Sequence, residues 1–130
     1  MRLFRRMLVN DADRLPVVGG GDMLLGVRVP TDVRPVDGLV HPLRPGGRAQ
    51  GMSVMAEDWR LMNPRLVPER LGGSALEGEI FETDDGVFAP PLALRPERPP
   101  HHVVGPEEPM ALGGLQTARA ATRPSWRLWW

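Results

Sequence analysis

The chain has 130 residues, with Gly 15 and Pro 15, 42% hydrophobic and 25% charged residues, an ordinary composition for one globular domain. It contains no Cys, Tyr or Lys, which excludes a disulfide scaffold, a zinc ribbon, a thiolate nucleophile and any P-loop or Schiff-base lysine. Its 16 Arg are balanced by 16 acidic residues, which argues against broad nucleic-acid binding.

Neither a signal sequence nor a membrane span is recognisable. The basic start of the chain is followed by an apolar run, Met7-Leu8-Val9, that is too short for a signal peptide. No segment approaches the roughly 20 apolar residues that a transmembrane helix needs. We therefore expect a soluble, cytoplasmic protein without a membrane partner.

The first half of the chain alternates short apolar segments with turn residues. Residues 3–9 and 23–29 are predicted strands, and three consecutive glycines precede the second. The segment 30–51 contains four prolines and is predicted to be a long loop, because proline interrupts both helices and central strands. A loop of this length in a small domain is usually functional or disordered.

The second half is predicted to end in a helix that begins after Glu107-Glu108 and is terminated by Pro124. Short strands followed by one C-terminal helix predict an α+β fold in a single domain, 1–130. The expected elements are a strand at 51–55, a helical turn at 57–61, a hairpin at 76–88 around Asp85-Gly86, an extended proline-rich linker at 90–100, a strand at 101–104 and a helix at 110–123.

Most clusters of chemically active residues have an ordinary structural explanation. His101 and His102 are adjacent, so on a strand they point to opposite faces and cannot chelate one ion, and we predict no metal site. The pairs Asp84-Asp85 and Glu107-Glu108 fall where turns and helix starts favour acids. No G-x-S-x-G nucleophile elbow is present.

The last segment, 119–130, holds three Arg and three Trp without an acid. Such a segment can bind single-stranded nucleic acid or a membrane surface. The alternative is that Trp126 packs on the core and the Arg residues cap the C-terminus of the helix, and this is the interpretation we favour.

Three residues on separate predicted strands are candidates for one cleft. Arg5 can bind a pyrophosphate through two parallel hydrogen bonds. Ser53 can bond a ribose hydroxyl, and His101 can orient a ribose or carry a proton.

Four segments follow one another along the chain: Leu3-Phe4-Arg5-Arg6, Asp37-Gly38-Leu39-Val40-His41-Pro42, Gly51-Met52-Ser53-Val54, and the run from His101 to Met110. In this order they resemble the type VI secretion effector toxins with an ADP-ribosyltransferase-like fold and their toxin–antitoxin relatives. The similarity extends from Leu3 to Trp126.

The resemblance implies a small split-sheet ADP-ribosyltransferase-like domain with a C-terminal helix and a cleft for NAD. Arg5 would face the phosphates on the nicotinamide side, Met52 and Ser53 would lie on the strand that binds NAD, and Ser53 and His101 would be catalytic. Met52 stands where the family has Thr, and we identify no Q-x-E or E-x-E glutamate. ADP-ribosyl transfer, NAD hydrolysis and NAD binding therefore all stay open.

The function that the resemblance implies is a bacterial growth-arresting toxin, neutralised by a cognate antitoxin or immunity protein. The alternative is a non-enzymatic interaction protein that docks through its proline-rich segments and its Arg/Trp tail.

Overall fold

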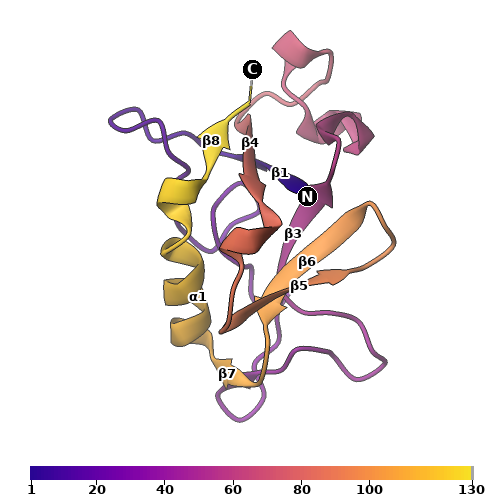
Figure 1. The fold of residues 1–130 in the computed structure, drawn as a ribbon, viewed down its shortest axis with the longest axis vertical. Coiled ribbons are helices and arrows are strands. Elements are labelled where there is room, and N and C mark those ends of the chain that lie inside the picture. The colour runs from indigo at the N-terminus through magenta and orange to yellow at the C-terminus, as the bar shows by residue number, and fades with distance from the viewer. Residues whose placement is uncertain (130) are drawn as a thin grey trace.

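The computed structural model describes residues 1–129, which form mostly antiparallel β-structure with one α-helix near the C-terminus (Figure 1). Within this part of the chain, six strands form a sheet in the order β5-β6-β3-β1-β4-β8, with every neighbouring pair antiparallel. Its strands are β1 (Arg2–Met7), β3 (Met52–Ala56), β4 (Glu79–Asp84), β5 (Leu92–Pro96), β6 (His101–Pro106) and β8 (Arg127–Leu128).

The remaining elements are short. Strands β2 (Leu39–Val40) and β7 (Met110–Ala111) form a separate pair, and β7 leads directly into helix α1 (Leu112–Ala120). No helix among residues 1–129 is long and apolar enough to cross a membrane. The 3-10 turns are η1 (Trp59–Leu61), η2 (Pro64–Leu66), η3 (Glu69–Leu71), η4 (Asp85–Val87) and η5 (Arg123–Ser125).

The sheet carries a hydrophobic core on each face. Alternate residues of β1 divide between them, with Leu3 and Met7 in the larger core and Phe4 in the smaller. The larger core also contains Leu115 of α1 and Trp126, and the smaller is closed by the 3-10 turns that follow β3. In Figure 1 these turns and α1 lie at different margins of the sheet.

The predicted strands at 51–55 and 101–104, the helical turn at 57–61 and the C-terminal helix are confirmed, each with shifted ends. The helix is shorter than the predicted 110–123 because Met110 and Ala111 pair with β2 instead. After its end, the Thr122 hydroxyl donates to the Arg119 carbonyl at 2.7 Å.

Three predicted elements are wrong. Residues 23–29 form no strand: Leu25 and Val27 are buried, but as an irregular segment packed into the core. The expected hairpin at 76–88 is the single strand β4, because β1 and β8 already occupy both of its edges. The expected linker at 90–100 contains β5, an edge strand that tolerates proline at its end.

Strands β1 and β3 separate soon after they meet. They are registered only at Leu3 with Ala56 and at Phe4 with Met55, whereas β1 and β4 pair along six residues. Beyond Phe4, the two central strands of the sheet therefore leave a gap between them.

Candidate functional site

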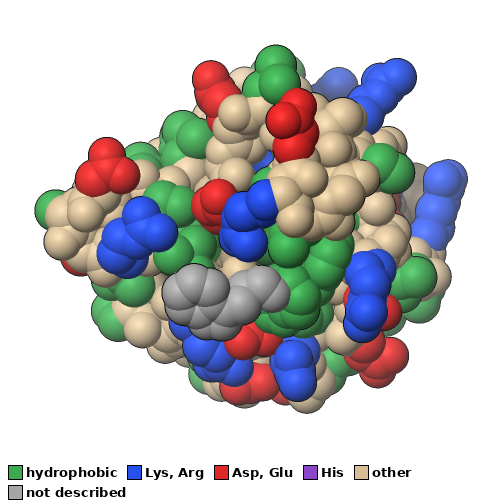
Figure 2. Space-filling model, turned by 90° about the horizontal axis from the view of Figure 1, so that it is seen from above, with side chains coloured by type: hydrophobic (Ala, Val, Ile, Leu, Met, Phe, Trp, Pro, Cys, Tyr) green, Lys and Arg blue, Asp and Glu red, His purple; other side chains and the backbone are tan. Residues whose placement is uncertain are grey.

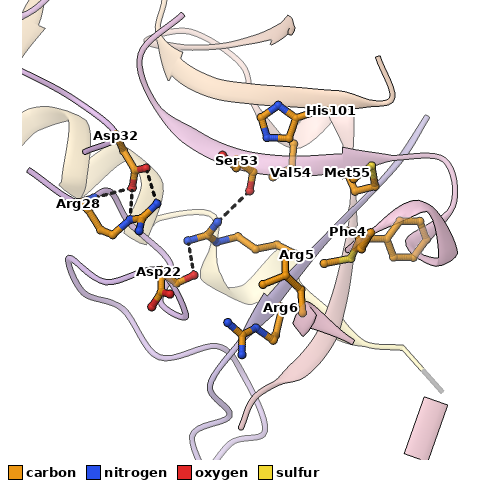
Figure 3. Close-up of a pocket in the computed structure, with 12 residues that line it drawn as sticks. Phe4, Arg5, Arg6, Asp22, Arg28, Asp32, Ser53, Val54, Met55 and His101 are labelled. Atoms are coloured by element: carbon orange, nitrogen blue, oxygen red, sulfur yellow. Dashed lines mark hydrogen bonds and ion pairs between the residues drawn. The ribbon is translucent and has the colours of Figure 1, made fainter. Parts of the chain in front are cut away.

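A cavity of about 360 Å³ lies where β1 and β3 separate. We refer to it as the β1–β3 cavity, and its volume is at the lower end of the range for small-molecule sites. Its lining combines apolar side chains with charged and polar ones (Figure 3). The residues that line it are Phe4, Arg5, Arg6, Asp22, Arg28, Asp32, Ser53, Val54, Met55, Met62, Leu66 and His101.

The guanidinium of Arg5 fills the gap between the strands and bonds to backbone carbonyls. Nη1 donates to Ser53 at 2.9 Å, Nη2 donates to Leu24 at 2.9 Å and to Asp22 at 3.2 Å, and Nε donates to Leu24 at 3.3 Å. Arginine has five N–H donors, so these bonds leave one donor on Nη1. Arg5 therefore lies in the predicted cleft, but it cannot also bind a phosphate bidentately.

The Arg5 side chain that makes these hydrogen bonds is also buried. Arg5 is only 8% exposed, and desolvation lowers the pKa of its guanidinium to about 10, against the attraction of Asp32. The group is still a cation at neutral pH, and among the described residues no carboxylate pairs with it directly. Its positive charge is therefore available to attract an anion into the β1–β3 cavity.

Arg6, the next residue on β1, has more uncommitted donors than Arg5. Nη1 donates to the Glu77 carbonyl at 3.2 Å, and this is the side chain's only hydrogen bond within residues 1–129. Its Nε is buried without a partner in that part of the chain. Sequence reasoning emphasised Arg5, yet Arg6 is the lining arginine best able to bind an anion.

Ser53 and His101 line the same cavity from β3 and β6. They belong to neighbouring strands, since Ser53 is registered with Val103 and Met55 with His101. His101 Nδ1 lies 3.3 Å from the Glu97 backbone carbonyl, and because a carbonyl only accepts, a hydrogen bond between them requires the tautomer with the proton on Nδ1. In the neutral ring Nε2 is then a proton acceptor.

Met52, in contrast, has no access to the β1–β3 cavity. It is completely buried in the larger core, on the face of β3 opposite to Ser53. The structure thus gathers Arg5, Ser53 and His101 and places Met52 among core residues, where its apolar side chain is suited to packing.

Three charged residues of the cavity come from the irregular segment 22–32, part of which was wrongly predicted to be a strand. Asp32 accepts from the Arg28 backbone N–H at 2.7 Å and pairs with its guanidinium at 3.1 and 3.2 Å. Hydrogen bonding to Asp32 raises the pKa of Arg28. The Asp22 side chain completes this polar wall (Figure 3).

A further acidic residue, Glu97, lies near His101. Glu97 and Asp32 both line a small space of about 30 Å³ that also touches Ser53 and His101. Glu97 pairs with Arg48 at 3.2 Å. Sequence reasoning missed both acids because neither lies in a Q-x-E or E-x-E motif.

The Arg/Trp tail is folded onto the protein. Trp126 is 1% exposed and its Nε1 donates to the Thr122 hydroxyl at 3.1 Å, which confirms that it packs on the core. Arg123 pairs with Asp13 at 2.6 Å, and Arg127 with Glu82 at 2.9 Å. Figure 2 shows arginine and acidic side chains interspersed on this end of the molecule. Trp130 lies outside the described residues.

Arg119 differs from what sequence reasoning expected. It does not cap the helix at the surface but is fully buried, and its Nη2 donates to the Val104 carbonyl of β6 at 2.8 Å. Burial, reinforced by the charge of Arg5, lowers its pKa to about 9. The helix is thereby tied to the sheet through a buried cation.

Within residues 1–129, no group of three or more His, Cys, Asp or Glu side chains is arranged to hold a metal ion. Comparison of the chain with family models, with curated proteins and with solved structures gives no match.

Proposed function

We propose that this protein is an NAD-using toxin of the ADP-ribosyltransferase-like type, active in the bacterial cytoplasm and neutralised by an antitoxin or immunity protein. The observation that carries the proposal is the convergence of Arg5, Ser53 and His101 on one cavity. These residues are far apart in the chain, and the sequence predicted that they would meet in one cleft.

The lining of the β1–β3 cavity suits one half of NAD. Phe4, Met55 and Met62 offer apolar contacts for a flat ring, while Ser53 and His101 offer polar atoms for a sugar. Arg5 has one N–H donor left and Arg6 has several, so Arg6 is the better candidate for the adjoining phosphate. NAD bound in this way would supply a glycosidic bond that can be cleaved with loss of nicotinamide.

The chain's own residues supply two further functions. His101 Nε2 can accept a hydrogen bond or a proton from a substrate hydroxyl. The sequence has no Q-x-E or E-x-E glutamate, and Asp32 is the carboxylate best placed to act in its stead. It lines both the β1–β3 cavity and the small space beside Ser53 and His101. A carboxylate there would favour positive charge that develops on a ribose.

The test combines inducible expression in bacteria with measurement of nicotinamide released from NAD by the purified protein. Wild-type expression should arrest growth, and His101→Ala and Ser53→Ala should each relieve the arrest. His101→Ala should lower nicotinamide release by about a hundredfold, the usual contribution of a positioned proton carrier, and Ser53→Ala should lower it as well.

Matched controls are available in the same chain. His102 lies next to His101 but bonds Pro100 through Nδ1 at 2.9 Å and lines none of the spaces around Ser53. Ser74 is an exposed serine outside the cavity. His102→Ala and Ser74→Ala should keep full toxicity, and a wild-type protein that neither arrests growth nor releases nicotinamide would rule the proposal out.

A further inference from the structure

The proline-rich segment 31–51 is ordered by local hydrogen bonds. Val36 and Leu39 exchange both backbone hydrogen bonds, at 2.8 and 3.0 Å, across a two-residue turn. The turn residues Asp37 and Gly38 have φ of 52° and 79°, the left-handed conformation that a tight hairpin turn requires and that glycine adopts without steric cost.

The side chain of Gln50 fixes this hairpin to the rest of the segment. Gln50 is 3% exposed, its Oε1 accepts from the Arg34 backbone N–H at 2.7 Å, and its Nε2 donates to the His41 carbonyl at 2.9 Å. The residues leading into and out of the turn are therefore held together. A surface built in this way loses little conformational entropy when a partner binds.

An apolar hollow of about 700 Å³ lies on this segment, and we refer to it as the loop hollow. Val36 is 54% exposed and Leu43 is 47% exposed, and both line it. Leu39, on the same hairpin, is 39% exposed. Large apolar side chains gathered on an ordered surface are typical of an interaction site.

The charged side chains that line the loop hollow have one sign. They are Arg34 and Arg44, and none of the described residues that line the hollow carries a carboxylate. Arg44 is committed, since its Nη2 donates to the carbonyls of residues 30 and 31 at 3.2 and 2.6 Å. Arg34 bonds only through its backbone N–H in the described part of the chain, so its guanidinium is available.

We propose that the loop hollow is a docking surface for a partner-protein segment that carries large apolar side chains beside Asp or Glu. The apolar side chains would contact Val36 and Leu43, and a carboxylate would pair with Arg34. The docking surface is independent of the proposed reaction, because the loop hollow lies outside the β1–β3 cavity. Arg44 also lines the small space beside Ser53 and His101, so a bound partner would lie next to the cavity without filling it.

The test measures binding of two short fluorescein-labelled peptides to the intact protein by fluorescence anisotropy. In one peptide Leu alternates with Asp and Glu, and in the other Leu alternates with Lys. The acidic peptide should bind at least about tenfold more tightly than the basic one, and added salt should weaken it. Arg34→Glu should weaken the acidic peptide about tenfold, and Val36→Asp combined with Leu43→Asp should abolish its binding.

Leu76→Asp is the matched control, because Leu76 is 88% exposed and lies outside the loop hollow; it should bind like the wild type. Thermal unfolding checks that each variant is folded, and Arg34→Glu leaves the apolar side chains untouched. Equal binding of both peptides, no binding of the acidic peptide, or an unchanged Arg34→Glu variant would each overturn the proposal. Sedimentation checks a different occupant. If the wild type self-associates, the double variant does not, and neither peptide binds, the occupant of the loop hollow is a second copy of the chain and not an acidic partner.

Discussion

Arg5 and Arg6 are adjacent on β1, yet the structure gives their guanidinium groups different tasks. Arg5 satisfies three backbone carbonyls, of Ser53, Leu24 and Asp22, that the gap between β1 and β3 would otherwise leave without donors. Arg6 makes a single hydrogen bond to the Glu77 carbonyl. Arg5 is therefore mainly structural, and Arg6 is the residue with more hydrogen-bond donors open to a ligand.

Substitution of Arg5 should lower stability before it affects any reaction. Arg5→Lys keeps the charge but replaces a planar fork by a single ammonium, so the carbonyls cannot all be satisfied. We expect the free energy of unfolding, measured with urea, to fall by about 2 kcal/mol or more. A variant as stable as the wild type would show that water replaces these bonds without cost.

Arg6→Gln should leave stability nearly unchanged and weaken the binding of NAD. Loss of one exposed hydrogen bond should change the free energy of unfolding by no more than about 0.5 kcal/mol. If Arg6 binds a phosphate of NAD, the KM for NAD in the nicotinamide-release assay should rise about tenfold or more while kcat changes little. An unchanged KM would remove Arg6 from the NAD site and leave its structural description intact.

At the scale of elements, helix α1 is attached to the sheet by one buried cation and by apolar packing. Arg119 reaches the Val104 carbonyl of β6, while Leu115 and Trp126 pack in the larger core. Arg119 Nε is buried without a partner among residues 1–129. A buried guanidinium that is only partly satisfied contributes less to stability than its size suggests.

Two substitutions separate the charge of Arg119 from its volume. Arg119→Met removes the buried cation and fills most of the space, so the free energy of unfolding should stay within about 1 kcal/mol of the wild type or rise. Arg119→Ala leaves a cavity and should cost about 3 kcal/mol. Urea unfolding of both variants measures the difference, and equal losses would mean that the hydrogen bond to Val104 dominates.

At the scale of the whole molecule, the chain has a simple titration at high pH. It contains no Lys, Tyr or Cys, so above the range of the N-terminal amine only arginines can release a proton. Burial lowers the pKa of Arg119 to about 9 and that of Arg5 to about 10. In the unfolded chain both groups return to the ordinary, higher value.

Stability should therefore rise between pH 9 and pH 11. In that window the folded protein releases protons that the unfolded chain keeps, and stability increases with pH wherever the unfolded state binds more protons. The slope cannot exceed about 1.4 kcal/mol per pH unit for each group. Urea unfolding at several pH values tests this, with Arg119→Met expected to flatten the profile near pH 9. A flat wild-type profile would mean that hydrogen bonds to carbonyls keep both guanidinium groups protonated.

The sequence predicted elements whose signals are local and failed where distant strands decide the outcome. The strand around Ser53 and the C-terminal helix have clear local patterns, and both exist. Asp85-Gly86 is a good hairpin dipeptide, but β8 arrives from the end of the chain to occupy the edge of β4 that a hairpin would need. The proline content of residues 90–100 predicted a linker where β5 lies, because the prediction did not allow for an edge strand, which tolerates residues that a central strand does not.

Some residues of the candidate site were predicted from the sequence and others were not. Arg5, Ser53 and His101 were predicted to meet, and they line one cavity. Asp22, Arg28 and Asp32 were not predicted, because an irregular segment places its side chains through tertiary contacts that no periodic pattern records. The bonding of Arg5 to carbonyls was also beyond prediction, since it follows from the gap between β1 and β3.

The short junction between β1 and β3 has a mechanical consequence. The sheet consists of two three-stranded halves, β5-β6-β3 and β1-β4-β8. Their facing strands β3 and β1 are joined by two registered residue pairs, by the Glu57 N–H, which donates to the Arg2 carbonyl at 2.8 Å, and by the side chain of Arg5. Such a junction can flex as a hinge while each half keeps its own ladder of hydrogen bonds. Backbone amides of β1 that face β3 should therefore exchange with deuterium faster than those that face β4. The mouth of the cavity would widen and narrow with that motion, so a ligand could enter without unfolding either half.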